Sequence, residues 1–531
     1  MPVWPKIVYT FSASLRTAAT RRKLREHHRS PAQQEHAFGA LTRELAGTAF
    51  WKEAGIEAGM DYTRFQTRVP LHTYEQIAPA VERMKTGESD VLWPGHCTLF
   101  GLTSGTSNGS PRCLPMTDAL LAHFRQAGFD ALLYYTARAG HVGAFRGRHL
   151  FYGATAKLTP LDGAAPVAAS AGEVSGIAAL NLPKWAGEHL YEPGLSVAQI
   201  AAWDAQADAI ATHTRSRDIT LIAGVPNGVV QLYPSLYQKC SAETRPITHL
   251  QDQWPNLECY VHGGALIAPY AAELRQALGP DVAFHDIYVA SEAFVAAQDA
   301  ESGAQGLRLI ADMGVFFEFV AMSDFDDLRI DQLGPKAVPI AGVRTGIDYV
   351  ILVTTPGGLA RYVLGDVVRF TSVAPPRLVY IGGTQLRLNA FDENVTEKDL
   401  TDVLVALCQR RDWTLVNFHV APIFTSNTLT GQQHGRHEWW IELKPGTTAT
   451  PIGPQMAEEL DADMQRASAL YARKRGAGML QVPVVRLVMP GVFEHWLRFH
   501  NKWGGQHKMP RCRSDRLVAD EFAQITNFAR D

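Results

Sequence analysis

Apolar residues in the first part of the chain recur with the period of an α-helix. Over residues 15–54 this pattern predicts helix, with a break at Ser30-Pro31. A second amphipathic helix is predicted over residues 73–85, with Thr73 as its N-cap. The chain is therefore expected to open in a helical region.

From residue 99 the pattern changes to short apolar runs bounded by glycine and proline, which alternate with helical segments such as residues 118–136. Alternating strands and helices indicate an α/β fold, with β-sheets flanked by helices. The strands predicted in this way lie at residues 98–102, 149–152, 219–223, 257–262, 284–287, 314–320, 348–354 and 367–370.

The last part of the chain reads as a separable α/β block. A strand over residues 377–383 ends in Gly382-Gly383, which makes a reasonable hinge. We therefore predict a large domain over residues 1–384 and a small one over residues 385–531. The small domain is expected to contain helix 396–411, strands 415–422 and 437–443, helix 454–475, strand 484–489 and helix 492–500.

Composition excludes several classes of protein. The 531 residues are 46% hydrophobic and 19% charged, so the chain can bury a large core and is not generally disordered. Its 53 acidic and 50 basic side chains give a formal net charge of −3, without the basic excess of a nucleic-acid-binding protein. We expect no nucleic-acid partner.

Cysteine spacing and hydropathy bear on the cellular compartment. The six cysteines include no C-x-x-C pair, which disfavours a disulfide scaffold or a structural zinc module. No apolar run approaches the roughly 20 residues that cross a bilayer. The basic cluster Arg21-Arg22-Lys23 follows too soon on a short mixed stretch for a secretory signal. These features predict a cytoplasmic protein with no membrane partner.

The most informative segment runs from Thr103 to Arg112, after a predicted strand. It gathers several hydroxyl side chains and two glycines. Glycine lets the backbone approach an anion closely, and successive N–H groups in such a turn form a phosphate-binding nest. Arg112 adds a positive charge suited to phosphate. A polar surface loop is the alternative interpretation.

Two known motifs can be compared with this loop. Gly105, Ser107 and Gly109 fit the G-x-S-x-G nucleophile elbow of α/β-hydrolases, but Pro111 and Pro115 argue against the helix that must follow the serine. The Walker phosphate loop is absent because no Gly-Lys pair follows. A serine hydrolase using Ser107 remains an alternative.

Acidic residues mark two further segments. Glu292, in Tyr288-Val289-Ala290-Ser291-Glu292, follows a strand and is placed to hold a Mg²⁺ that bridges phosphate oxygens. Asp366, in Arg361-Tyr362-Val363-Leu364-Gly365-Asp366, can present both oxygens to a ribose diol. Taken singly, Glu292 is interpreted as a solvated loop carboxylate and the Asp366 segment as a turn.

Lys508 lies in the glycine-flanked segment 504–511 and can swing into a cleft to stabilise a developing oxyanion, although a flexible basic tail is the alternative. His437 and Glu438 resemble metal ligands at first sight. On a strand their side chains point to opposite faces, and no histidine follows four residues after His437. We therefore expect no metal site there.

In this order, the segments resemble the acyl acid amido synthetases of the Gretchen Hagen (auxin-responsive) type, within the adenylate-forming superfamily. The resemblance extends over about residues 65–515, and the ordered set is more specific than any one motif. Further matching stretches are Val69-Pro70-Leu71 with Tyr74-Glu75, Trp254-Pro255-Asn256-Leu257-Glu258 with His262-Gly263-Gly264, His437-Glu438-Trp439, and the C-terminal lysine segment.

The resemblance implies a large N-terminal adenylation domain, a small mobile C-terminal α/β cap, and ATP with Mg²⁺ as cofactors. A small carboxylic acid would form an acyl-AMP with release of pyrophosphate, and an amino acid amine would then attack it to give an amide. The implied roles are phosphate binding by Thr103, Ser104, Gly105, Thr106, Ser107 and Arg112, nucleotide binding by Tyr288 and Ser291, Mg²⁺ binding and catalysis by Glu292, ribose binding by Asp366, and charge stabilisation by Lys508.

The sequence also departs from the family pattern. Arg112 replaces the lysine usual in the wider superfamily, and Val363 replaces an arginine of many relatives. Segment 388–394 lacks the hinge lysine of plant members, which gives Lys508 more weight. Helix 120–135 and loop 223–227 should line the acid pocket. Three side chains there suggest an apolar acid unless they belong to the core: Leu132, Tyr134 and Tyr135.

Three other functions stay open at this point. An adenylate-forming enzyme could transfer its acyl group to another acceptor, such as coenzyme A. The hydrolase would act through Ser107 without ATP. A nucleotide- or acid-binding protein would bind the same molecules without catalysis.

Overall fold

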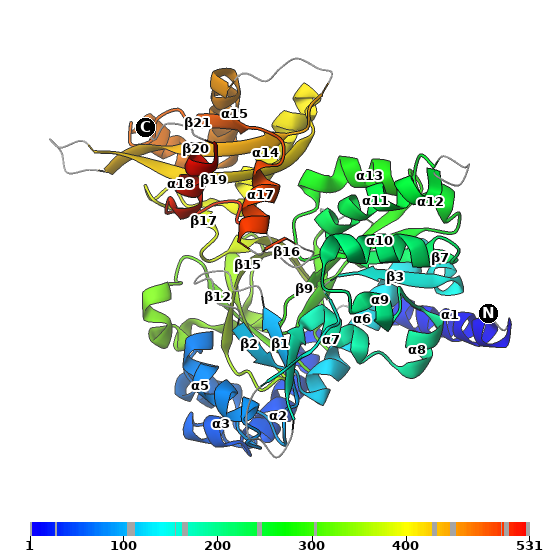
Figure 1. Cartoon of the computed structure of the whole chain (residues 1–531). Helices are drawn as coiled ribbons and strands as arrows, with labels where there is room; N and C mark the ends of the chain where they lie inside the picture. Colours follow the sequence, from blue (N-terminus) through cyan, green and yellow to red (C-terminus); the bar gives the residue numbers. More distant parts are fainter. Residues whose placement is uncertain are drawn as a thin grey trace. The chain divides into compact units, whose positions relative to one another are not determined.

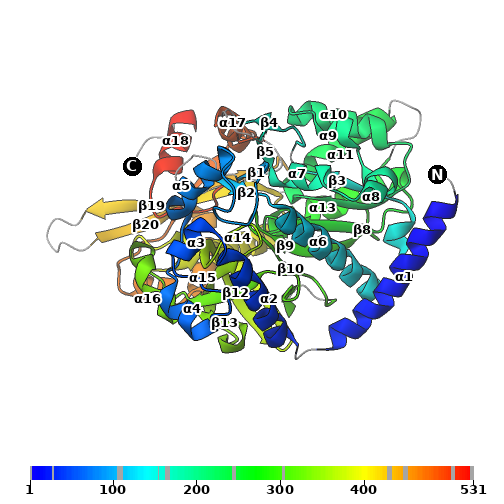
Figure 2. The ribbon, with the colours of Figure 1, turned by 90° about the horizontal axis from the view of Figure 1, so that it is seen from below.

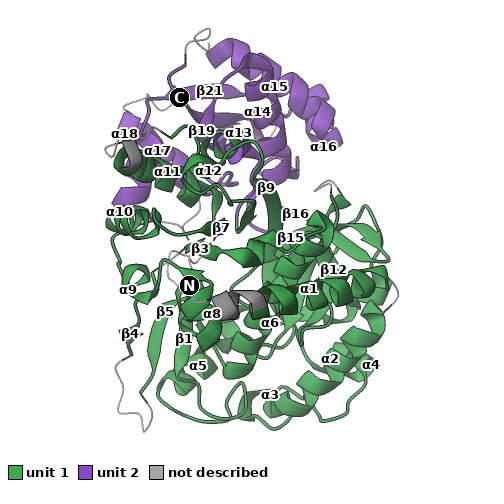
Figure 3. Cartoon of the chain, turned by 90° about the vertical axis from the view of Figure 1, so that its right-hand side faces the viewer, with its two compact units in different colours: residues 1–264, 274–379 green, residues 265–273, 380–531 purple. Residues whose placement is uncertain are grey.

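The computed structural model describes residues 3–26, 29–103, 112–153, 155–161, 168–241, 247–301, 305–426, 433–446, 453–500, 502–503 and 509–526. The chain forms two compact units (Figure 3). The first consists of Met1–Gly264 and Leu274–Val379, and the second of Ala265–Glu273 and Tyr380–Asp531. The predicted assignment of the nucleotide and acid site to residues 1–384, with residues 385–531 as a cap, remains a prediction about function.

Helices open the first unit, as the hydrophobic pattern predicts: α1 Val3–Arg25, α2 Ser30–Leu45, α3 Ala49–Glu53, α4 Tyr62–Arg68 and α5 Tyr74–Lys85. The break falls at the expected place, because Ser30 begins α2 and Pro31 occupies its first turn, where a missing N–H costs nothing. Thr73 precedes α5, and its backbone N–H donates to Oε1 of Gln76 at 2.8 Å. None of the described helices is long and apolar enough to span a bilayer.

The described residues form a 12-stranded sheet in the order β13-β12-β14-β15-β16-β11-β10-β9-β8-β7-β3-β6. Strands β6, β3, β7, β8 and β9 pair in parallel, as the alternation of strands and helices predicts, whereas β9–β10, β10–β11, β11–β16, β14–β15, β12–β14 and β12–β13 are antiparallel pairs. The strands are β3 Arg148–Tyr152, β6 Tyr191–Glu192, β7 Ile219–Gly224, β8 Cys259–Gly263, β9 Ala283–Val289, β10 Phe294–Ala297, β11 Leu307–Leu309, β12 Phe316–Ala321, β13 Val338–Pro339, β14 Asp348–Thr354, β15 Tyr362–Val373 and β16 Pro376–Gly383.

Helices cover both faces of the parallel strands (Figure 1). On one face, Tyr135 of α6 (Asp118–Ala139) packs with Leu221 and Cys259 of β7 and β8. On the other, Trp203 of α10 (Trp203–Thr214) stacks on Tyr152 of β3 with ring centroids 4.4 Å apart. The parallel strands are therefore buried on both faces, which accounts for their continuous apolar runs.

A smaller sheet in the first unit has the order β2-β1-β5-β4, with β1 Leu99–Thr103, β2 Arg112–Pro115, β4 Thr159–Pro160 and β5 Ser170–Glu173. Strands β1 and β2 are antiparallel, and Thr103 lies opposite Arg112. The two ends of the hydroxyl-rich loop are thus held side by side on a pair of strands.

The second unit contains a three-stranded sheet in the order β19-β20-β21, which separates two apolar cores among its described residues. Successive tryptophans of β20 show the alternation of a strand: Trp439 packs with helices α14 and α15, and Trp440 with α17 and α18. The elements are β17 Arg387–Leu388, β18 Val395–Thr396, α14 Glu397–Arg411, β19 Leu415–Ser426, β20 Gln433–Leu443, α15 Gly453–Ala467, α16 Ala469–Gly476, β21 Val484–Val488, α17 Val492–Phe499 and α18 Leu517–Thr526.

Two features of this unit differ from the sequence-based expectation. The single helix predicted over residues 454–475 is wrong, because the chain breaks at Ser468, whose Oγ accepts from the N–H of Tyr471 at 3.2 Å and so caps α16. Helix α18 was not predicted at all. Its residues Phe522 and Ala519 complete the core around Trp440.

His437 and Glu438 behave as strand alternation predicts. Glu438 forms ion pairs with Arg486 and Arg516, at 3.1 and 2.9 Å. On the opposite face, Nε2 of His437 lies 3.0 Å from Oε1 of Glu393, and both side chains are fully buried. Glu393 therefore ties segment 388–394, the predicted hinge, to the central strand of its own unit.

The carboxylate of Glu393 should make the stability of the protein depend on pH. Burial opposes its ionisation, but the hydrogen bond with His437 and the Phe391 backbone N–H, 2.7 Å away, bring its pKa below the usual 4.5. A lowered folded-state pKa stabilises the fold above the unfolded-state value, and this stabilisation is lost as pH falls through the folded-state value. We expect Glu393→Gln to lower the free energy of unfolding by about 1–3 kcal/mol at neutral pH and by less below pH of about 4.

Urea unfolding at both pH values tests this expectation. The exposed residue Glu458 in the same unit provides the control variant, Glu458→Gln, which should change stability by less than about 0.5 kcal/mol. Equal effects of the two substitutions at neutral pH would contradict a structural role for the Glu393–His437 pair.

Candidate active site

Tyr288 and Asp366 come together from distant parts of the sequence. Tyr288, in β9, is buried, and its hydroxyl donates to Oδ2 of Asp366 at 2.5 Å. Asp366 lies within β15, so the interpretation of its segment as a turn is wrong. The register shows a bulge instead: Val367 lies opposite Val350 and Val363 opposite Leu352, which leaves extra residues between them.

Glycine makes this bulge possible. Gly365 has φ +86°, in the left-handed region that side chains with a Cβ rarely adopt. The bulge changes the direction in which the next side chain points, so that Asp366 meets Tyr288. The Gly-Asp pair that sequence analysis singled out is thus a device for aiming a carboxylate.

Glu292 lies close to this pair. Burial, and to a smaller extent the negative charge of Asp366, raise the pKa of Glu292 to about 7, against the opposing effect of the Arg112 guanidinium. The fully buried Tyr362 also faces Glu292, and burial and this carboxylate together raise the pKa of its hydroxyl. A carboxyl group whose pKa lies near neutral pH and which lies beside a second carboxylate is a feature of functional sites.

Arg112 is held at the base of the hydroxyl-rich loop by α5. Its guanidinium lies 5.7 Å from the centre of the Tyr74 ring and 3.7 Å from the Glu75 carboxylate. The Tyr74 hydroxyl accepts from the backbone N–H of Cys113 at 2.9 Å. The Tyr74-Glu75 stretch, which entered the sequence analysis only as a matching motif, therefore orients Arg112 toward Glu292 and Tyr362.

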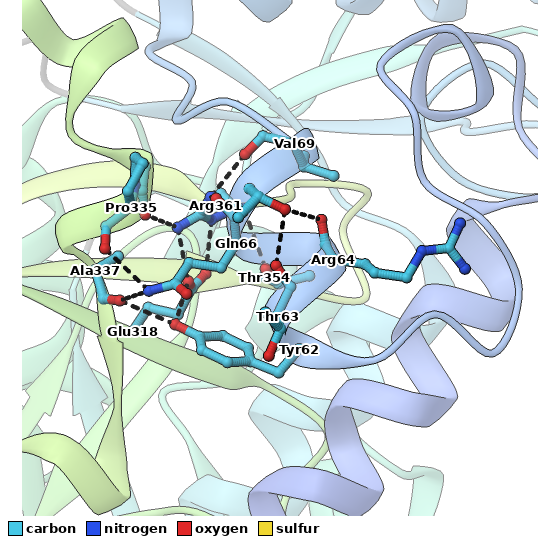
Figure 4. Close-up of polar contacts among 12 residues, drawn as sticks. Tyr62, Thr63, Arg64, Gln66, Val69, Glu318, Pro335, Ala337, Thr354 and Arg361 are labelled. Carbon is cyan, nitrogen blue, oxygen red and sulfur yellow. Dashed lines mark hydrogen bonds and ion pairs between the residues drawn. The ribbon is translucent and has the colours of Figure 1, made fainter.

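A fully buried arginine, Arg361, anchors strand β15, which carries Tyr362 and Asp366 (Figure 4). The guanidinium of Arg361 forms an ion pair with Glu318 of β12 at 3.0 Å. It also donates to the carbonyl oxygens of Gln66 and Val69, at 2.8 and 2.7 Å, and of Gly334, at 2.8 Å. The ion pair and these three carbonyl acceptors supply the partners that a buried guanidinium needs.

The backbone around Arg361 extends this anchor. Its carbonyl accepts from the N–H of His72 at 3.0 Å, and the His72 carbonyl accepts from the N–H of Val363 at 2.8 Å. His72 thus lies beside Tyr362 as a single parallel bridge. Since α5 begins two residues after His72, one buried arginine fixes both the strand of Tyr362 and Asp366 and the helix that orients Arg112.

Sequence reasoning did not assign roles to Arg361, Tyr362 or Glu75. The available signal was an arginine between apolar residues at the start of a strand, which points to a buried and fully paired guanidinium. Among the predicted site residues, the structure brings together Tyr288, Glu292, Asp366 and Arg112. Thr103 ends β1 opposite Arg112, and Ser291 is half-buried next to Glu292. Ser104, Gly105, Thr106, Ser107 and Lys508 lie outside the described residues.

Side chains on α6 that were considered for the acid pocket lie in the core. Leu132 and Tyr135 pack against β7 and β8, and Tyr134 packs with Phe294 and Ile310. Their apolar character therefore carries no information about the substrate.

The geometry bears on the serine hydrolase that the sequence left open. A nucleophile elbow leads from its serine directly into a helix, whereas the chain that follows the hydroxyl-rich loop enters strand β2 at Arg112. This argues against the hydrolase. The described residues hold no cluster of three or more metal-ligating side chains. The Glu292 carboxylate offers oxygens of the kind that a Mg²⁺ bound mainly to phosphate and water would take.

Family models match three stretches that together cover about two thirds of the chain: the GH3 family N-terminal domain over residues 21–193, the central domain over 308–382 and the C-terminal domain over 398–517. The chain belongs to the GH3 family. Curated relatives extend over nearly its whole length. Indole-3-acetic acid-amido synthetase GH3.8 of Oryza sativa subsp. indica is 23% identical over 91% of this chain and 88% of its own. Jasmonoyl–L-amino acid synthetase JAR4 of Nicotiana attenuata is 22% identical over 90% of each chain.

Solved structures place this GH3 protein in the same fold. GH3.15 acyl acid amido synthetase has a TM-score of 0.72 at 18% identity and covers 96% of both chains. A 2-hydroxyisobutyryl-CoA ligase in complex with 2-HIB-AMP has a TM-score of 0.57 at 13% identity, covering 96% of this chain and 93% of its own. The comparisons confirm the family, the α/β fold class and the amido synthetase class that the sequence motifs predicted.

Removing the Arg361 guanidinium should destabilise the first unit strongly. Arg361→Met leaves the Glu318 carboxylate buried without a positively charged partner, and we expect the free energy of unfolding to fall by about 3–5 kcal/mol. The exposed Arg344 serves as the matched control, because Arg344→Met should cost less than about 0.5 kcal/mol. Chemical denaturation measures both. If Arg361→Met were as stable as the control, the anchoring role would have to be abandoned.

Proposed function

We propose that this GH3 protein uses ATP to activate a small carboxylic acid as its acyl-AMP and then joins the acyl group to the amine of an amino acid. The observation that carries the proposal is the meeting of Tyr288, Asp366, Glu292 and Arg112, four residues from three distant segments, at one place in the fold of an adenylate-forming enzyme. No other cluster of the candidate site residues is found in the described part of the chain.

The reaction needs activation because hydroxide is a very poor leaving group from a carboxylate. In the first half-reaction a carboxylate oxygen attacks the α-phosphorus of ATP and pyrophosphate leaves. In the second, the amino acid nitrogen attacks the acyl carbon, AMP leaves, and the nitrogen gives up a proton. The protein's task in both steps is to orient the reactants and to stabilise charge on phosphate.

The candidate site residues would have separate tasks in this scheme. Asp366, aimed by the bulge at Gly365, would accept hydrogen bonds from the ribose hydroxyls, and Tyr288 would hold that carboxylate in place. Arg112 would bind phosphate together with the loop from Thr103 to Ser107. Lys508 would stabilise charge during adenylation. Glu292 would hold Mg²⁺, which neutralises phosphate charge when bound.

The two units would divide these tasks. Residues 1–384 would bind the nucleotide and the acid, and residues 385–531 would act as a cap that rearranges between the half-reactions, as domains do in many enzymes that sequester their substrates. We also propose a cytoplasmic location, where ATP and free amino acids are available and the scattered cysteines stay reduced.

The names of the relatives refer to indole-3-acetic acid and to jasmonoyl conjugates, and one GH3.15 structure is a complex with 2,4-DB. We propose an acid of comparable size for this chain. Its fold is also similar to that of a coenzyme A ligase, so the acceptor has to be tested directly.

Product analysis distinguishes the acceptors. The protein is incubated with ATP, Mg²⁺, a panel of aryl and alkyl carboxylic acids, the 20 amino acids and coenzyme A. We expect pyrophosphate release that depends on one class of acid, and a product with the mass of an acyl–amino acid amide. A thioester product alone would establish the coenzyme A ligase instead, and absence of pyrophosphate release with every acid would favour a binding protein without catalysis.

Glu292 should make nucleotide binding depend on pH. Because its pKa is raised to about 7, the carboxyl group is mostly neutral below that value and charged above it. Only the charged form binds Mg²⁺ well, so the affinity for Mg²⁺–ATP should rise between about pH 6 and pH 8 and then level off. We expect Glu292→Gln to weaken binding about tenfold or more at pH 8 and to flatten this dependence.

Titration calorimetry with Mg²⁺–ATP measures the effect. The control variant Glu44→Gln changes an exposed carboxylate in α2 and should keep the dependence of the wild type. An unchanged pH profile in Glu292→Gln would remove this residue from the metal site.

A further inference from the structure

Helix α1 turns three large apolar side chains of its first two thirds outward. Three of them are well exposed: Val8 at 58%, Phe11 at 65% and Leu15 at 58%. Over the middle of the helix the residues that face the protein are small or polar and nearly inaccessible: Ala13, Thr17 and Thr20. Leu24, near the carboxyl end, is partly buried against the core formed by α6 and β10. A helix that uses its apolar face only to pack on a globular core shows the opposite arrangement.

The inner face of α1 is already occupied. Figure 2 shows α1 lying alongside α6, and Oγ1 of Thr17 lies 2.8 Å from Oγ1 of Thr136 in α6. Lys23 reaches Asp130 and Asp312, at 2.6 and 2.7 Å. These contacts fix the rotation of the helix about its axis. Because residues three and four apart lie on one face, Val8, Phe11 and Leu15 form a continuous stripe on its outer side.

The charge of α1 is as one-sided as its apolar surface. Between Val3 and Arg25 the helix has no acidic residue and six basic ones, so all 53 acidic residues of the chain lie elsewhere. Arg16 lies over the ring of Phe129 at 5.2 Å, on the flank of the stripe. Arg22 and Arg25 are exposed at its carboxyl end. The outer surface of α1 is therefore an apolar stripe bordered by arginine.

The apolar stripe and the positive charge of α1 together indicate which kind of partner would bind it. Two copies of α1 would bring together two strongly basic helices with no acidic residue to compensate, which disfavours self-association through the stripe. An apolar stripe with arginine at its borders is the composition of helices that lie in the headgroup region of a bilayer. Anionic lipids attract such helices electrostatically, and the apolar side chains enter the acyl boundary.

We propose that α1 docks this chain on an anionic lipid surface, with Val8, Phe11 and Leu15 inserted and Arg22 and Arg25 in contact with the headgroups. The sequence-based expectation of no membrane partner considered only spanning segments, and a helix that lies on the surface is a different case. The proposal stands independently of the ligase function.

Vesicle co-sedimentation tests it, with phosphatidylcholine vesicles that either contain or lack phosphatidylserine. We expect the full chain to bind the anionic vesicles and to bind the neutral ones at least tenfold more weakly. Arg22→Ser/Arg25→Ser should weaken binding to anionic vesicles roughly thirtyfold, from about fivefold per arginine. Raised salt should release the wild type.

A matched pair of variants distinguishes insertion of the α1 stripe into the bilayer from nonspecific hydrophobic adsorption of the protein. Phe11→Ser/Leu15→Ser should reduce anionic binding by at least tenfold, on the order of the gain from burying two such side chains. Leu328→Ser/Met489→Ser removes two other exposed apolar side chains, and it should bind as the wild type does. No binding of the wild type to anionic vesicles, or equal loss in both pairs, would overturn the proposal. So would a wild-type oligomer that Phe11→Ser/Leu15→Ser dissociates, because the stripe would then be covered by protein.

Discussion

The rest of the candidate site depends on one buried guanidinium. Arg361 compensates its charge with Glu318 and donates to three backbone carbonyl oxygens: that of Gln66 in α4, that of Val69 directly after α4, and that of Gly334. A charge removed from water requires such pairing, so the segments that supply the partners have to be held together around the guanidinium. The position of the site depends on these contacts, because the strand that carries Tyr362 and Asp366 begins directly after Arg361.

Much of the architecture was predictable from the sequence. Strands β3, β7, β8, β9, β12 and β14 appear where apolar runs predict them, because burial on one or both faces imposes a pattern that is visible locally. The bulge at Gly365 was not predictable, because residues 362–370 read equally well as a turn followed by a strand. The register with β14, a partner identified only by the fold, decides between the two. Likewise, the break at Ser468 has no glycine or proline to announce it, and a capping serine is too common to be a signal by itself.

The candidate site was predictable in part. Motif order grouped Tyr288, Glu292, Asp366 and Arg112, and the structure brings these four residues together. Their roles toward a nucleotide stay predictions. The residues that position them were missed. Tyr74 and Glu75 act on Arg112, and Arg361 acts through carbonyl oxygens of residues with unrelated side chains, so nothing in the local sequence identifies these partners. Long-range contacts with backbone atoms are the part of a site that is hardest to predict from a single sequence.

The central claim is that Tyr288 and Asp366, joined by a hydrogen bond at the bulge, form one nucleotide-binding unit. Titration calorimetry with Mg²⁺–ATP on the wild type, Tyr288→Phe, Asp366→Asn and the double variant tests it most directly. The account predicts that Asp366→Asn weakens binding about tenfold to a hundredfold, and that adding Tyr288→Phe to it has much less effect than Tyr288→Phe has alone. Full ATP affinity in Asp366→Asn, or independent effects of the two substitutions, would contradict it.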